Sequence, residues 1–356
     1  FVSFAMSGQT TRKYSNEFMN IGVDAAALGM SNAVTSHTRN VNSGYWNPAG
    51  LVNIEDNQLA LMHSSYFANI ANYNYIAYAM PIDDRSAVAI SVIRFGVDDI
   101  LDTTQLIDDQ GNINYDRINK FSTADYGVTL SYARKLPIDG LNYGINAKVI
   151  RRVIGDFATA WGFGFDAGIQ FESKNDWKFG FMARDITTTY NSWAIDEEQF
   201  EKISGAIDGQ NQTLPEKSEL TLPKLELGIS KLWTFHYDYT LLAAFNLNAR
   251  FAETNDVIST SFASFAPALG FEFGYTDLVF LRAGVGNFQN ELQIDNPENL
   301  TFQPNLANHF FYRIFNNIFH SLLSHNFPLP NSSTQSFNKT FHITFLTKFS
   351  TYFSIR

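Results

Sequence analysis

Hydrophobic and polar residues alternate one by one along most of the chain after about residue 57. In the clearest segment, Trp161 to Phe171, every odd position is apolar and every even position is glycine or polar. A period of two predicts β-strands with one apolar face. The same alternation predicts further strands at about 57–66, 73–80, 86–95, 126–132, 143–149, 177–184, 225–229, 237–248, 266–275 and 279–285.

The composition of the two strand faces indicates the class of β-protein. A soluble β-sandwich, which is the alternative, would carry many long charged side chains on its outer face. Here the polar face consists mainly of Gly, Ser, Thr and Asn, and the apolar face carries aromatic rings at strand ends. Charged residues make up 17% of the chain, against about 25% in ordinary soluble domains. These features predict an all-β fold, an antiparallel transmembrane β-barrel whose apolar face contacts lipid.

The connectors between the expected strands alternate in length. Short turns are expected at 81–85, 136–140, 172–176, 233–236 and 275–277, and longer loops at 96–123, 152–160, 185–220, 249–262 and 286–298. Outer-membrane barrels combine short periplasmic turns with long extracellular loops, and their strand number is usually even. With further strands expected after residue 290, the length of the chain suits about 14 strands.

The two longest expected loops are acid-rich and contain 14 of the 35 acidic residues. Within the second, Asp196 to Ile207 has an acidic start that suits a helix N-terminus. This segment predicts a short helix over the barrel mouth, with Phe200, Ile203 and Ile207 on one face. It could instead be an element that docks a partner.

Charge, cysteine content and hydropathy exclude several classes of protein. The formal net charge of −10 argues against nucleic-acid binding, and the absence of cysteine removes disulfides, thiolate metal sites and cysteine nucleophiles. The longest apolar stretches, such as Tyr75 to Met80, are far shorter than the roughly 18 residues of a transmembrane helix. Membrane crossing would therefore use strands. Residues 1–8 are expected to be a signal-peptide remnant, because Ala5 and Ser7 are small residues after an apolar start.

Residues 307–356 differ in composition from the rest of the chain. They contain no Gly, Asp, Glu or Trp, but four of the seven His. Apolar residues between Phe311 and Leu322 recur with a helical period that does not suit a barrel strand. We interpret this tail as divergent or frameshifted; an unusual final hairpin is the alternative.

Candidate chemistry is sparse. His63 and Ser64 are adjacent, so on a strand they point to opposite faces and cannot form a catalytic dyad. Asp108 to Asn112 lacks the spacing of a calcium loop. No enzyme activity, metal or cofactor is predicted. The ions expected to face the lumen either pair with one another and with the plug or line a transport path; they are Lys148, Asp166, Lys224, Glu226, Glu272 and Arg282.

The segment before the first expected strand has the features of a plug. Residues 25–30 are small and apolar, and Asn47 precedes Pro48 in a turn where its amide can bond back to the backbone. Such a turn satisfies its own polar groups, as a segment inside a barrel must. The expected organisation is therefore a plug over 9–56 and a barrel over 57–356.

Two motifs in this segment, IGVDAAALGMSNA and YWNPAGL, resemble the PorV/PorQ family of Bacteroidetes outer-membrane proteins. The likeness covers about residues 14–306. It implies a FadL-like barrel of fourteen strands in the outer membrane, with Asn47, Pro48 and Ala49 as the plug turn. It also implies a role in type IX protein secretion. In that role, extracellular loops bind secreted cargo, the translocon or attachment-complex proteins.

The alternative function is that of a FadL-type transporter of hydrophobic small molecules, which would use a lateral gap in the wall. The tail departs from the family pattern, in which a Gly-rich strand and a final strand with an aromatic end are expected. Barrel closure is therefore in doubt.

Overall fold

The computed structural model describes residues 15–310 except 104–105, 108–109, 198–216, 237, 277 and 292–298, together with residues 340–345 and 353–354. The predicted signal-peptide remnant, the predicted loop helix with Phe200, Ile203 and Ile207, and most of the tail lie outside these residues.

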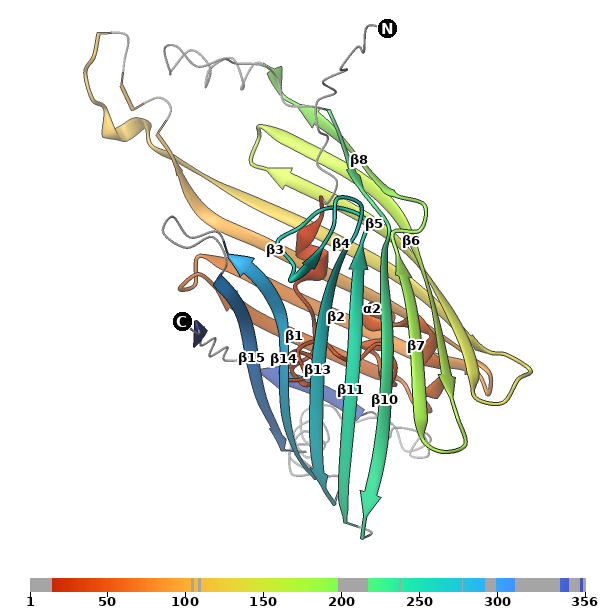
Figure 1. The fold of residues 1–356 in the computed structure, drawn as a ribbon. Coiled ribbons are helices and arrows are strands. Elements are labelled where there is room, and N and C mark those ends of the chain that lie inside the picture. Colours follow the sequence, from red (N-terminus) through yellow and green to blue (C-terminus); the bar gives the residue numbers. More distant parts are fainter. Residues whose placement is uncertain are drawn as a thin grey trace, which may run out of the picture.

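The fold is a single sheet, antiparallel except for one pair of strands, that curves around the N-terminal segment (Figure 1). The all-β prediction is confirmed. The strands are β1 (Gln58–Tyr66), β2 (Ala71–Asp83), β3 (Ser86–Asp102), β4 (Asn119–Lys135), β5 (Leu141–Ile154), β6 (Ala158–Glu172), β7 (Trp177–Arg184), β8 (Thr189–Ile195), β9 (Ser218–Thr221), β10 (Lys224–Phe235), β11 (Tyr239–Arg250), β12 (Ile258–Ser259), β13 (Ser264–Tyr275), β14 (Val279–Glu291), β15 (Asn299–Phe310), β16 (Thr340–Phe345) and β17 (Phe353–Ser354).

Neighbouring strands in sequence pair as hairpins around most of the wall. At two places around the wall, two strands lie end to end and together take the place of one strand. β7 and β8 both pair with β6 on one side, and on the other side β7 pairs with β10 and β8 pairs with β9. The sheet is not closed, because no ladder joins β15 to β1 within the described residues. The β1 edge pairs instead with β16, in parallel, and β15 pairs with β14 and β17.

The connectors at one rim are short, as predicted, but two loops expected at the other rim are shorter than predicted, because parts of them are strand. β3 continues to Asp102 and β4 begins at Asn119, so the loop between them is 103–118 rather than 96–123. The loop predicted at 152–160 shrinks to 155–157. β3 and β4 extend beyond their predicted ends because their ladder resumes after a bulge, where Ile100 pairs with Phe121.

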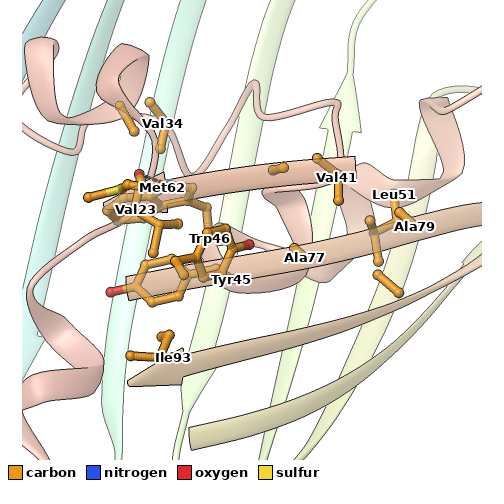
Figure 2. Packing of buried hydrophobic residues seen from close by; sticks show 14 of the residues in the cluster. Val23, Val34, Val41, Tyr45, Trp46, Leu51, Met62, Ala77, Ala79 and Ile93 are labelled. Atoms are coloured by element: carbon orange, nitrogen blue, oxygen red, sulfur yellow. Dashed lines mark hydrogen bonds between the residues drawn. The ribbon is translucent and has the colours of Figure 1, made fainter. Parts of the chain in front are cut away.

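The N-terminal segment folds into short helical turns inside the curved wall. These are η1 (Glu17–Asn20), α1 (Ala25–Gly29), α2 (Ser43–Trp46) and η2 (Pro48–Asn53); a further turn, η3 (Tyr115–Arg117), lies in the loop after β3. Figure 2 shows the apolar side chains of the plug, including Trp46 and Val23, against β1–β3. The alternation along the other strands predicted a polar inner face, but the inner face of β1–β3 is mainly apolar. Met62, Tyr75 and Ile93 on this face belong to the apolar core that packs against the plug.

The outer face of the wall carries an exposed apolar band. Along β6, Trp161, Phe163, Phe165, Ile169 and Phe171 are 52, 61, 53, 45 and 38% exposed. Ten residue steps at roughly 3.3 Å, tilted by about 40°, cover roughly 25 Å, the height of the lipid-facing band of outer-membrane barrels.

An aromatic girdle marks the rim with the short turns. It is formed by exposed Trp177, Trp233, Phe235, Tyr239 and Tyr275, and Trp and Tyr are enriched at membrane interfaces. Together with the apolar band, it gives the wall the two defining features of a lipid-facing surface. The protein is thus a membrane-embedded β-sheet of the outer-membrane barrel type.

Candidate functional site

The plug turn is anchored to the wall by Asn47, which is fully buried. Its Oδ1 accepts a hydrogen bond from the Ala49 N–H at 3.2 Å, the Asx-type turn expected from the sequence. Its Nδ2 lies 3.1 Å from the Ile169 carbonyl oxygen on β6 and 3.4 Å from the Phe181 carbonyl oxygen on β7. One amide side chain therefore joins the turn to two neighbouring wall strands.

Glycines on the inner face let the plug backbone lie directly on the wall. They form three cross-strand pairs, Gly144–Gly168, Gly180–Gly228 and Gly270–Gly284. A Cβ at any of these six positions would come within 3.0 Å of plug atoms, which belong to residues 47–49, 35–36 and 30–31 respectively. The small even positions in the strand pattern are thus contact points for the plug.

The wall is interrupted between the β7–β10 ladder and the β8–β9 ladder. Ladder pairing of β7 with β10 stops at Arg184 and Lys224, and pairing of β8 with β9 starts at Thr189 and Thr221. Residues 185–188 and 222–223 lie between, outside both ladders. Asp185 and Thr188 have positive φ angles of 55° and 60°, so the chain bulges at this level. Pro223 has no N–H to donate to a ladder.

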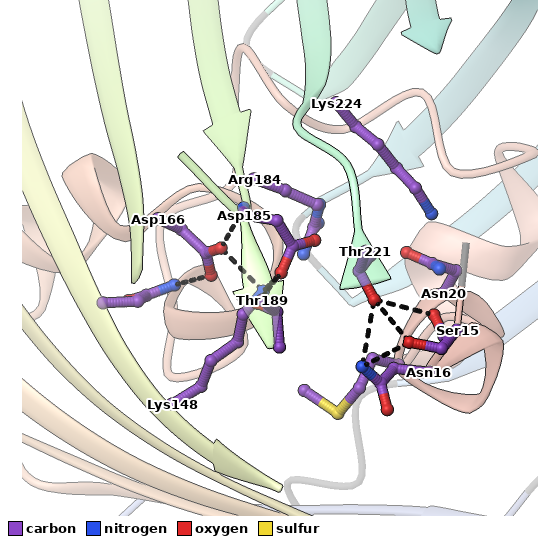
Figure 3. Close-up of polar contacts among 12 residues, drawn as sticks. Ser15, Asn16, Asn20, Lys148, Asp166, Arg184, Asp185, Thr189, Thr221 and Lys224 are labelled. Atoms are coloured by element: carbon purple, nitrogen blue, oxygen red, sulfur yellow. Dashed lines mark hydrogen bonds and ion pairs between the residues drawn. The ribbon is translucent and has the colours of Figure 1, made fainter. Parts of the chain in front are cut away.

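A buried ion cluster holds this bulge (Figure 3). The Lys148 Nζ lies 2.7 Å from Asp166 and 2.6 Å from Asp185, and all three side chains are less than 10% exposed. Asp185 also accepts a hydrogen bond from the Thr189 hydroxyl at 2.5 Å, and its own N–H donates to Asp166 at 2.8 Å. The cluster therefore connects β5, β6 and both ends of the bulge.

The other predicted lumen ions also lie on the inner side, in separate pairs. Glu226 accepts from Arg184 at 2.5 Å and from the plug hydroxyl of Thr35 at 3.2 Å. Lys224 contacts Glu17 of the plug at 3.3 Å, and Arg282 contacts Glu272 at 2.5 Å. The structure thus pairs Lys148 with Asp166 and Arg282 with Glu272, whereas Glu226 and Lys224 contact residues outside the predicted set.

The first described residues of the plug lie across the interruption. The Ser15 and Asn16 side chains hydrogen-bond the Thr221 hydroxyl of β9 at 2.8 and 3.1 Å. Asn191 of β8 donates to the Asn16 Oδ1 at 2.8 Å. The plug therefore joins β8 to β9 beside the bulge; Figure 3 shows the contact of Ser15 and Asn16 with Thr221.

Cavities lie on both sides of the interruption. On the lumen side, cavities of about 20 and 70 Å³ are both lined by Asn20, Tyr45 and Arg184; Asp185 also lines the first, and Lys224 the second. On the lipid side, an open apolar groove of about 420 Å³ runs over β6, β7, β10 and β11. Its upper row is Ile169, Phe181, Leu227 and Leu247.

A strip of small side chains connects the groove to the bulge. The next outward row above it is Ala167, Ala183, Leu225 and Ala249. Three of these four side chains are single methyl groups, so the apolar surface stays open up to the level of Asp185. The interruption thus has an apolar approach outside and polar cavities inside.

Two plug side chains near the wall have strongly shifted pKa values. Burial, together with the positive charges of Lys178, Arg39 and Arg282, lowers the pKa of His37 to about 3. Its Nδ1 is enclosed and has no hydrogen-bond partner among the residues that the structure describes. Burial likewise raises the pKa of Tyr45, whose hydroxyl donates to the Met19 carbonyl oxygen at 2.7 Å. Both groups are neutral at physiological pH.

Sequence reasoning missed Asp185 and Thr189, because residues 185–220 were assigned to a loop. It placed Arg184 at the end of the strand predicted at 177–184 but did not include it among the lumen ions. A signal was present in the run Asp185-Ile186-Thr187-Thr188-Thr189, a short turn-forming segment between two alternating stretches, with Pro223 opposite. Within the described residues, no group of three His, Asp or Glu is placed to hold a metal ion. In the same part of the chain, no helix has the length and apolarity to cross a bilayer.

Comparisons with known proteins give structural similarities only. No family model matches the chain, and no curated protein sequence does. The CymD monoaromatic hydrocarbon channel is similar with 12% identity and a TM-score of 0.49, over 82% of this chain and 89% of that one. The Pseudomonas putida toluene transporter TodX has 13% identity and a TM-score of 0.46, over 80% and 88%. A FadL homologue from Pseudomonas aeruginosa has 13% identity and a TM-score of 0.43, over 79% and 85%.

Proposed function

We propose that the protein is an outer-membrane channel that admits hydrophobic small molecules sideways, from the membrane, through the interruption beside β7 and β8. One observation carries the proposal. The break in the ladder at residues 185–188 and 222–223 has cavities on its lumen side and, beyond the strip of small side chains, an apolar groove on its lipid side. An unbroken wall would offer a membrane-dissolved molecule no such passage.

Hydrophobic molecules suit this route because the approach is apolar over its whole length. The groove is lined mainly by Phe, Ile and Leu side chains, and the alanines of the strip above it present only methyl groups. The polar lining beyond the bulge would bind such a molecule weakly, which favours its release into the lumen.

The test fills the alanine strip. In Gram-negative cells that produce the protein, Ala167→Phe with Ala183→Phe should lower the uptake rate of N-phenylnaphthylamine, a hydrophobic probe whose fluorescence rises when it enters a phospholipid layer. The matched control is Ala147→Phe, an outward alanine on β5, two strands from β7. Equal uptake by parent, filled variant and cells without the protein would contradict the proposal.

A second candidate function is the binding of type IX secretion components at the loop rim. β3 and β4 have 17 residues each, whereas about 9–11 suffice to cross a bilayer. Their hairpin therefore projects beyond the membrane. Asp98, Asp99 and Asp116 are exposed on it, so its charge would favour basic partner surfaces. This projecting hairpin is the observation that favours a protein partner.

Removal of 103–118 tests the second candidate. Because Asp102 pairs with Asn119, an Asn-Gly turn can join the two strands there. The shortened protein should lose co-purification with secretion components in a type IX-competent cell but keep N-phenylnaphthylamine uptake. Retention of every partner would reject this function and leave the uptake proposal unaffected.

A further inference from the structure

The outer face changes from apolar to polar between two adjacent rows of paired residues near the loop rim. The lower row, running from β1 through β6 to β8, is Leu61, Ile76, Val92, Val128, Val149, Phe163 and Tyr190. The next row, two residues further along each strand, is His63, Asn74, Arg94, Tyr126, Arg151, Trp161 and Ser192. This change marks the level at which the acyl chains end and the headgroups begin.

Two arginines lie at this level and face outward. Arg94 and Arg151 both pair with Tyr126, one from each side, so their Cα atoms are about 10 Å apart across β4. Their side chains point away from the lumen, because Ile93 and Ile150, their chain neighbours, are buried inside. Side chains of this length can reach one group placed over Tyr126.

Aromatic side chains position both guanidinium groups. Arg151 lies over the Trp161 ring at 4.8 Å from its centroid, and Tyr126 is the direct cross-strand partner of Arg94. Arg94 also contacts the exposed Asp98 at 2.9 Å. Within the described residues no carboxylate lies within 4.0 Å of Arg151, so the pair keeps a net positive charge.

We propose that Arg94 and Arg151, with Tyr126 and Trp161, form a binding site for the phosphate group of a lipid in the leaflet at the loop rim. A phosphate at headgroup height would accept hydrogen bonds from both guanidinium groups, and arginine forks match phosphate geometry. Asp98 competes for Arg94 only weakly, because an exposed ion pair contributes little. The proposal depends on the membrane boundary and not on lateral uptake.

Native mass spectrometry of the full chain tests the site. The protein is taken from nanodiscs of phosphatidylcholine with a minority of phosphatidic acid, and retained phosphatidic acid is counted. Each arginine near an anionic surface strengthens binding appreciably, so Arg94→Gln with Arg151→Gln should lower the retained ratio of phosphatidic acid to phosphatidylcholine by roughly tenfold or more. Arg94→Lys with Arg151→Lys should retain an intermediate amount, because charge remains but the fork geometry is lost.

The matched control is Lys120→Gln with Arg117→Gln, which removes the same charge from the projecting hairpin at the same rim. It should leave the ratio unchanged. If the double glutamine variant retains as much phosphatidic acid as the parent, or if the control lowers retention equally, the proposal is wrong. Should the glutamine variant fail to fold, the lysine variant decides: parental retention would overturn the site.

Discussion

At the scale of single residues, Lys148 has the greatest influence on the interruption of the wall. Its ammonium group contacts both Asp166 and Asp185 in a site where all three side chains are less than 10% exposed. Removing one member of such a buried cluster leaves an uncompensated charge, which costs about 3–5 kcal/mol. The geometry of the bulge therefore depends on one cation.

Lys148→Met should destabilise the protein strongly, because it leaves two carboxylates facing each other. Asp185→Asn should cost less, since the Thr189 hydroxyl can still bond the amide. We expect a lower temperature of unfolding for both variants, measured by circular dichroism, with Lys148→Met the lower. Lys120→Met is the control, because its pair with Asp99 is exposed and is worth at most about 1 kcal/mol. Unfolding temperatures that do not differ between Lys148→Met and Lys120→Met would refute this role.

His37, a residue of the plug, makes the stability of the folded protein dependent on pH. Its pKa is about 3 in the folded protein against 6.5 when unperturbed, so it stays neutral when folded and takes up a proton on unfolding below about pH 6.5. Its contribution to stability is complete above pH 6.5 and is lost as the pH falls towards 3, by at most about 1.4 kcal/mol per pH unit. Compared with His37→Asn, the parent should lose stability more steeply between pH 6.5 and 4. Parallel stability curves would show that His37 is solvated.

At the scale of elements, the inner glycine pairs fix where the plug lies. Gly180 and Gly228 face Thr35 and Ser36 so closely that no side chain fits between. The alternation of β7 and β10 could be predicted from the sequence, and so could the small residues of their inner face. Which glycines meet the plug could not, because that depends on the register between strands far apart in sequence.

Gly180→Val should displace the plug without disrupting the wall. Its side chain would overlap the backbone at Thr35 and Ser36, so we expect higher single-channel conductance in planar bilayers. Ala147→Val, an outward substitution of the same kind on β5, should leave the conductance unchanged. Parental conductance in a folded Gly180→Val protein would mean that the plug is not held at this pair.

The interruption between β7 and β8 shows the limit of prediction at this scale. The alternation of apolar and polar residues ends at Arg184 and resumes at Thr189. Because it stops between these residues, sequence reasoning interpreted residue 185 as the start of a long loop. The positive φ angles of Asp185 and Thr188 are held by the buried cluster. Such long-range contacts leave only a weak local signal.

At the scale of the whole molecule, the strand pattern predicted the class of fold because lipid imposes one rule on every outward position. The Asx turn at Asn47 was also predictable, since its partner Ala49 is local. The only sequence feature that indicated incomplete closure between β15 and β1 was the unusual tail. The apolar core that joins the plug to β1–β3 was missed, because it makes both faces of these strands apolar.

The route through the wall can be measured directly because the chain has no cysteine. A single Asn20→Cys places a thiol in the plug, where it lines both lumen cavities beside the interruption. In vesicles, a lipid-dissolved pyrene maleimide should label this thiol, and the added Ala183→Phe should slow the labelling severalfold. Labelling by a charged, water-soluble maleimide should stay the same in both proteins. If Ala183→Phe leaves the lipid-dissolved reaction unchanged, or slows both reagents equally, hydrophobic molecules do not enter through this gap.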